Sequence, residues 1–183
     1  MHDSSDKLLS IIDEMRELER YLAILYGIAA TRVNEPFIGT IMRKISIESA
    51  MHNYILTMLK SLIRECPPRK VFDLETLLSL QGSIEEAITH AKSLIDYMNS
   101  MEKVHYDITS TIIEKLNDLE SHEENAVKVY SFLLRSYLPI TSTRIDEKHR
   151  ITSKLIVKLL KGISDDEKYH EELLEIIRDI SLK

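Results

Sequence analysis

Four residues with metal-binding side chains occupy stretches of sequence that are otherwise apolar. Glu19, His52, Glu123 and His170 each fall at a position that the surrounding leucines and isoleucines mark as buried. Burying a carboxylate is costly unless it is paired, hydrogen-bonded or bound to a metal ion. Carboxylate and imidazole groups are ligands of iron, manganese and zinc. These residues therefore predict a metal site in the interior of the protein.

Two of these residues belong to a spacing that occurs twice. Glu19 precedes Tyr26 by seven residues, and Glu123 precedes Tyr130 by seven residues. A buried tyrosine usually finds a hydrogen-bond partner for its hydroxyl group. We expect Tyr26 and Tyr130 to lie in the core with their hydroxyl groups hydrogen-bonded.

The other two residues end a second pair of similar segments. Residues 45–52 read ISIESAMH and residues 163–170 read ISDDEKYH, so isoleucine, serine, an acid and the final histidine recur in step. Together with the two Glu–Tyr pairs, this similarity indicates an internal repeat. Each half of the chain would supply one glutamate, one tyrosine and one histidine.

Amphipathic helices are expected to position these residues. Apolar residues at intervals of three and four predict long helices, over 5–32, 36–64, 107–138 and 145–181. The helix pairs 5–64 and 107–181 are joined by a connector at 66–106. In this connector, a short helix near 73–80 should end at Gln81-Gly82, and Ser83–Glu86 resembles a capping box that opens a helix to about 105. A similar box at Ser164–Glu167 would restart the last helix after Gly162.

The helical spacing also predicts which side chains face inward. In the connector it predicts an apolar stripe that is available to a partner or a second copy, formed by Ile84, Ile88, Ile95, Met98 and Met101. In the last helix it predicts an inward face formed by Leu155, Leu159, Ile163, His170, Leu173 and Ile177. The whole predicts an all-α fold, a four-helix bundle with one long crossover that contains an extra helix.

Length and composition exclude several classes of protein. A chain of 183 residues fits one domain, 1–183. Four glycines and four prolines are too few for the turns of a sheet-rich fold. The net charge of −6 and the lack of a basic stripe argue against nucleic-acid binding. A single cysteine, Cys66, excludes an internal disulfide or a four-thiolate metal site. The polar N-terminus and the absence of a long apolar run predict a cytoplasmic protein that does not span a membrane.

One motif leads to a known family. Glu167-Lys-Tyr-His170 is a Glu-x-x-His pair on one helical turn, and two other predicted helices each contribute a glutamate. In this arrangement the chain resembles the ferritin-like di-iron carboxylate proteins, which include rubrerythrins, bacterioferritins and ferritins. The resemblance covers all four long helices but not the connector at 66–106.

The resemblance implies a role for each matching residue. Glu19 and Glu123 correspond to terminal carboxylate ligands, Glu167 to a carboxylate that bridges two metal ions, and His52 and His170 to the imidazole ligands. Tyr26 and Tyr130 correspond to tyrosines that hydrogen-bond a carboxylate beside the site and that could donate a proton or an electron. Glu48 and Asp166 correspond to acids that orient the outer ring nitrogen of the opposite histidine.

The chain departs from the family pattern at one position. The first half should contain a glutamate three residues before His52, but that residue is Ser49. Glu48 lies four residues before His52, on the same helix face, and is therefore a substitute ligand to consider. Without it, the site would hold one tightly bound metal ion, an asymmetric pair, or none.

Three functions remain open. The resemblance implies an iron or manganese oxidoreductase, similar to rubrerythrin peroxidases, that reacts with O2 or peroxide; zinc would also fit the ligands. Because the chain lacks a four-cysteine electron-transfer module, a separate protein would have to donate electrons. The alternative is a degenerate bundle with a structural or protein-interaction role, and the third is metal storage. We expect a homodimer.

Overall fold

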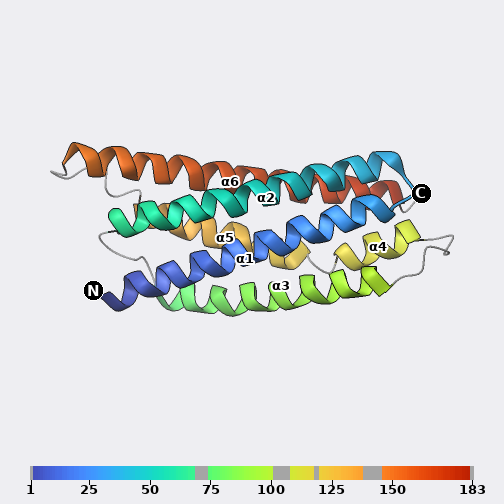
Figure 1. Ribbon diagram of the computed structural model, residues 1–183, viewed down its shortest axis with the longest axis horizontal. Helices are drawn as coiled ribbons and strands as arrows, with labels where there is room; N and C mark the ends of the chain where they lie inside the picture. The colour runs from blue at the N-terminus through green and yellow to red at the C-terminus, as the bar shows by residue number, and fades with distance from the viewer. Residues whose placement is uncertain (1, 69–73, 101–107, 118–119, 138–145, 182–183) are drawn as a thin grey trace.

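The computed structural model describes residues 2–68, 74–100, 108–117, 120–137 and 146–181. Within these ranges, the side chains of 2–5, 74, 76, 77, 108, 117, 120–126 and 181 lie outside the description. Within these ranges the chain forms six α-helices and no strand (Figure 1). They are α1 (His2–Arg32), α2 (Pro36–Glu65), α3 (Leu74–Ser100), α4 (Ile108–Asn117), α5 (Glu120–Tyr137) and α6 (Glu147–Ser181). The all-α prediction is confirmed.

The long helices lie lengthwise beside one another (Figure 1). α1 runs antiparallel to α2, α5 runs antiparallel to α6, and contacts between α2 and α6 join the two pairs. α3 returns along the molecule from the end where α2 finishes to the end where α4 begins. On this path it packs against α1 and α5. Residues far apart in sequence are thereby brought to the same level of the helix assembly.

Helix α3 belongs to the core of the molecule. Its residues Ile84, Ile88 and Met98 are buried, and Ile95 is partly buried. Met101, the last residue of the predicted stripe, lies outside the described residues. The prediction that this stripe is a free docking surface is therefore wrong, because α1 and α5 already cover it. Helical spacing identifies an apolar face but not the element that packs on it.

Two predicted helix breaks are absent. α3 continues through Gly82 and α6 continues through Gly162. Neither glycine has the left-handed backbone that terminates a helix. A glycine within a helix costs only about 1 kcal/mol relative to alanine. Buried side chains near each glycine, Ile84 in α3 and Leu160 and Ile163 in α6, offset that cost.

Two other local expectations also change. The helix predicted over 107–138 consists of α4 and α5, with residues 118–119 outside the description. Leu155, which was expected to face inward, is 44% exposed. The buried face of α6 passes instead through Ile156, Leu160 and Ile163. Leu155 lies about 100° around the helix from Ile156 and so falls outside this face.

The long helices are not membrane spans. Among the residues that the structure describes, no helix combines the length and the apolar composition that crossing a bilayer requires. The buried apolar residues instead come from all six helices and form one cluster.

Replacing Gly82 or Gly162 with alanine should stabilise the protein. A Cβ atom at either position meets no atom within 4 Å, so each change should raise the free energy of unfolding by about 0.5–1 kcal/mol. Urea denaturation followed by circular dichroism measures this change. Gly39→Ala is the control, because its Cβ would lie 3.2 Å from the Ala30 carbonyl oxygen and should destabilise the fold. Destabilisation by Gly82→Ala would show that the helix breaks there.

Candidate metal centre

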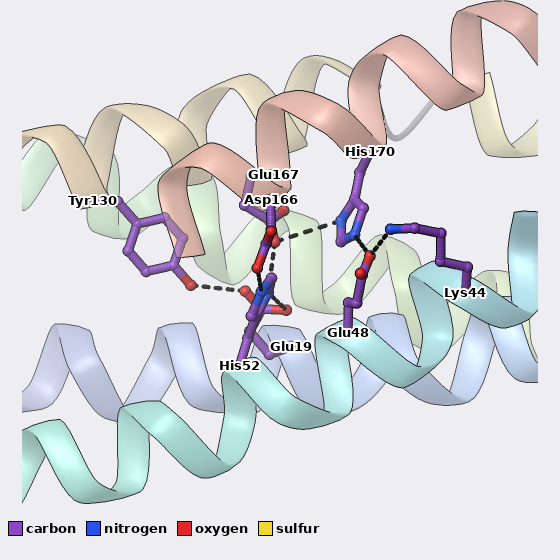
Figure 2. Close-up of polar contacts among 8 residues, drawn as sticks. All are labelled: Glu19, Lys44, Glu48, His52, Tyr130, Asp166, Glu167 and His170. Carbon is purple, nitrogen blue, oxygen red and sulfur yellow. Dashed lines mark hydrogen bonds and ion pairs between the residues drawn. The ribbon is translucent and has the colours of Figure 1, made fainter. Parts of the chain in front are cut away.

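Four helices bring polar side chains together at one level of the protein interior. α1 supplies Glu19, α2 supplies His52, α5 supplies Tyr130, and α6 supplies Glu167 and His170 (Figure 2). All five side chains are buried, and each is at most 2% exposed. The ends of these side chains point toward one another rather than toward solvent. The polar cluster that the sequence predicted therefore exists among these residues.

Three of the side chains form a compact group that could hold a metal ion. His52 Nδ1 lies 2.8 Å from Glu167 Oε1 and 3.6 Å from Glu19 Oε2. Each of the three residues offers one ligand atom, and these atoms all lie within 4.8 Å of one another. Two carboxylates and an imidazole are a donor set that iron, manganese and zinc all accept.

The atoms of this group lack hydrogen bonds. Glu19 Oε2, His52 Nδ1 and Glu167 Oε1 are each shielded from solvent and make no hydrogen bond. The contact between His52 Nδ1 and Glu167 Oε1 is short enough for a hydrogen bond but is not aligned as one. Nearly all buried polar atoms in proteins have a partner. Three exceptions that converge on one point are what a cation-binding position requires.

Glu167 lies between two imidazole rings. In addition to its contact with His52, its Oε1 atom lies 3.6 Å from His170 Nδ1. The centroids of the two rings are 5.9 Å apart. Both imidazoles therefore present the Nδ1 atom to the same carboxylate. One oxygen of Glu167 thus contacts both imidazole rings.

The outer nitrogens of both histidines face acids on the opposite helix. His52 Nε2 lies 3.2 Å from Asp166 Oδ2, and His170 Nε2 lies 2.9 Å from Glu48 Oε2. Both contacts are those expected from the sequence. An N–H donated from Nε2 leaves the Nδ1 lone pair directed into the site. The two acids thus fix the orientation of both imidazole rings, with each Nδ1 atom facing Glu167.

Glu48 is held in this orienting position from two sides. Besides His170, it contacts Lys44, which lies one helical turn earlier on α2 and also lies over the ring of Tyr169. The hypothesis that Glu48 substitutes as a metal ligand is not supported by this geometry, because the carboxylate is engaged away from the Glu19–His52–Glu167 group. The contribution of Lys44 was missed in the sequence. Its spacing of four residues from Glu48 was the available signal.

The two tyrosines are both fully buried. The Tyr130 hydroxyl group donates a hydrogen bond of 2.7 Å to Glu19 Oε1. Burial and the nearby Glu19 and Glu167 raise the pKa of Tyr130 well above its usual value, so the hydroxyl keeps its proton. Tyr130 thus fixes one oxygen of Glu19 and leaves the other, Oε2, directed at His52. A catalytic role of Tyr26 and Tyr130 stays a prediction.

Glu123 and Ser49 are the two remaining positions of the predicted site. Glu123 lies in α5, but its side chain is outside the described residues. Ser49 is fully buried on α2, and its hydroxyl oxygen makes no hydrogen bond.

Electrostatics in the metal-free protein follow from burial and close contact. Burial and the neighbouring Glu167 raise the pKa of Glu19. Burial alone would raise the pKa of Glu167, but His170 and His52 outweigh burial and lower it. Burial alone would lower the pKa of His52, but Glu167 and Glu19 outweigh it and raise the pKa to about 11. Without a metal ion, His52 therefore carries a positive charge that the Glu167 carboxylate balances.

Comparisons of the chain with protein-family models, with curated proteins and with solved structures gave no match. The geometry of the site therefore carries the functional argument.

The charge on His52 makes the stability of the metal-free protein depend on pH. A pKa raised from 6.5 to about 11 stabilises the fold fully below pH 6.5, and this contribution is lost as the pH rises toward 11. The free energy of unfolding of the wild type, relative to that of His52→Gln, should therefore fall over this range. Urea denaturation in the presence of a chelator measures both proteins. A difference that stays constant with pH would show that His52 is neutral in the folded protein.

Proposed function

We propose that this protein is a ferritin-like metalloprotein that uses iron or manganese to react with O2 or peroxide. One observation carries the proposal: Glu19 Oε2, His52 Nδ1 and Glu167 Oε1 are buried, converge on one another and lack hydrogen bonds. Leaving three such atoms unsatisfied is costly. A bound cation would satisfy all three at once.

The residues present fit a resident metal ion. Glu19, His52 and Glu167 would hold one ion, while His170 and Glu167, with Glu123 from the sequence pattern, would hold a second. Oxygen and imidazole ligands suit iron and manganese, and they also accept zinc. A redox-active ion would supply the electron transfer to the oxidant.

The helix arrangement supports the ferritin-like part of the proposal. The two antiparallel pairs, α1 with α2 and α5 with α6, supply the five clustered side chains, and α3 runs lengthwise beside them (Figure 1). This arrangement fits a four-helix bundle with one long crossover. Unlike an external connector, however, α3 packs between α1 and α5.

The remaining residues prepare the site for redox chemistry. Asp166 and Glu48 fix the two imidazoles, and Tyr130 keeps a proton beside Glu19. The surrounding apolar core excludes bulk water from the ligands. The oxidant would be O2 or peroxide, and a separate protein would donate electrons. The protein would act as a homodimer.

A degenerate bundle with a structural or interaction role is the second candidate. Ser49 favours it, because this residue replaces one expected ligand. In that case the charged pair formed by His52 and Glu167 would serve only to hold α2 against α6. The buried atoms of Glu19, His52 and Glu167 that make no hydrogen bond favour the metalloprotein. Metal storage would use the same ligands and predicts a large oligomer with many metal ions per chain.

Metal content separates these functions. Wild-type protein, purified without chelators or an affinity tag, should contain at least one iron, manganese or zinc ion per chain by inductively coupled plasma mass spectrometry. His52→Ala and Glu167→Gln should each lose it, because each removes one atom of the three-ligand group. His149→Ala and Glu175→Gln, which alter exposed residues of α6, should retain it. A wild-type protein that stays metal-free even after anaerobic loading with iron or manganese would leave only the structural role.

Oxidation of the iron-loaded protein tests the redox function. Anaerobic addition of Fe(II) followed by peroxide should produce a visible absorption band, and reductant should remove it. Tyr130→Phe should slow the formation of the band while leaving the iron content unchanged, because it removes the hydrogen bond to Glu19 but no ligand. Tyr54→Phe, at an exposed position of α2, is the matched control. Iron that binds tightly but does not respond to peroxide would argue for storage.

A further inference from the structure

Exposed apolar side chains are concentrated on α2 and α6. Of the thirteen large hydrophobic residues that are exposed in the described part of the chain, ten belong to these two helices. The two helices contact each other along the side of the molecule opposite to α3 (Figure 1). Whereas α3 packs against α1 and α5, no described helix covers the outer face of α2 and α6. Apolar residues grouped on one face indicate an interaction surface.

Four of the exposed residues on α2 form a row with symmetric spacing. They are separated by four, three and four residues and are Ile47, Met51, Tyr54 and Met58. This is the spacing of a helix face that packs against another helix. Because the spacing is the same in both directions, an antiparallel second copy of α2 would place its Tyr54 opposite Met51. Its Met58 would lie opposite Ile47. The centre of the row lies between His52 and the next residue.

The exposed residues of α6 form a row that is symmetric in the same way. They are separated by 4, 21 and 4 residues and are Ile151, Leu155, Ile176 and Ile180. The centre of this row lies between Asp165 and Asp166. Since Asp166 Oδ2 lies 3.2 Å from His52 Nε2, the centres of the two rows lie at the same level of the molecule. A single two-fold axis at this level therefore pairs both rows with the same rows of a second copy.

Charges on α6 favour the same antiparallel pairing. The exposed charged residues over 154–161 are all lysines, whereas those over 171–179 are all acids. Pairing about the common centre brings Lys158 within one residue of Glu172 of the second copy. Near the centre itself, Asp165 lies 3.8 Å from Lys161, and Asp166 contacts His52. The face therefore matches its own charge pattern, and such complementarity selects a partner.

The face is large enough for a stable dimer. α2 has 30 residues, which corresponds to a length of about 45 Å. Two adjacent helices are about 20 Å wide, so the face measures about 900 Å² on each copy. Stable protein interfaces bury about 800 Å² on each partner.

We propose that two copies of this chain associate through the outer faces of α2 and α6, about a two-fold axis at the level of His52 and Asp166. In the dimer, α2 packs antiparallel on α2 of the second copy, and α6 packs antiparallel on α6. Both apolar rows are then covered. This inference specifies the interface of the homodimer that belongs to the proposed function, and it does not depend on a bound metal ion.

Sedimentation equilibrium tests the proposal. The wild type should have the mass of two chains. Met51→Lys and Tyr54→Glu should each raise the dissociation constant of the dimer about a hundredfold, because each places an unpaired charge in an apolar interface. An equimolar mixture of the two variants should form dimers again, because the introduced lysine of one chain faces the introduced glutamate of the other. Parallel pairing would not bring these two positions together.

Leu78→Lys is the matched control, since it alters an exposed apolar residue of α3 and should leave the dimer intact. Circular dichroism should show unchanged helix content in all three variants, because the altered side chains are exposed. The metal content of monomeric Met51→Lys should equal that of the wild type, because Met51 is not part of the three-ligand group. Loss of metal and loss of the dimer are thereby measured separately.

Four outcomes would overturn the proposal. The first is a monomeric wild type. The second is a dimer that persists in both Met51→Lys and Tyr54→Glu, which would place the interface elsewhere. The third is a pair of monomeric variants that do not associate when mixed, which would exclude antiparallel pairing. The fourth is a monomeric wild type that co-sediments with phosphatidylcholine vesicles while Tyr54→Glu does not, which would assign the face to a lipid surface.

Discussion

The contact of the Glu167 carboxylate with two imidazoles is the constraint around which the interior is organised. His52 and His170 approach Glu167 Oε1 from α2 and α6, and all three side chains are buried. A carboxylate in an apolar core is stable only with partners of this kind. The contact therefore fixes α2 against α6, and with them the two antiparallel helix pairs. Glu19 from α1 and Tyr130 from α5 then complete the cluster.

The outer contacts determine what this cluster can do. Asp166 and Glu48 each engage the Nε2 atom of the histidine on the opposite helix, which directs both Nδ1 atoms inward. The two acids differ in their surroundings: the Asp166 side chain is 52% exposed, whereas Glu48 is less exposed and also paired with Lys44. The two halves of the site are therefore not equivalent. Ser49 extends this asymmetry into the interior.

The sequence was most informative where regular apolar spacing extended over a whole helix. The helix over 36–64 and the inward position of His52 followed from the same apolar spacing, and the structure has α2 over Pro36–Glu65 with His52 buried. The sequence was less informative where the end of a helix was inferred from a single residue. Gly82 and Gly162 suggested breaks, but packing of the flanking apolar residues maintains both helices. The apolar stripe of α3 was visible in the sequence, whereas its cover by α1 and α5 was not.

The sequence alone determined the all-α class and the residues of the polar cluster, because both depend on local spacing and on the cost of burying charge. Only the tertiary structure decided how these residues meet. The hydrogen bond of Tyr130 to Glu19 joins α5 to α1, and the position of Glu167 between two rings joins α6 to α2. The tertiary structure also decided that Glu48 faces His170 and Lys44. Helical periodicity specifies the direction of a side chain from its own axis, but the neighbouring helix, with its register and rotation, specifies what that side chain contacts.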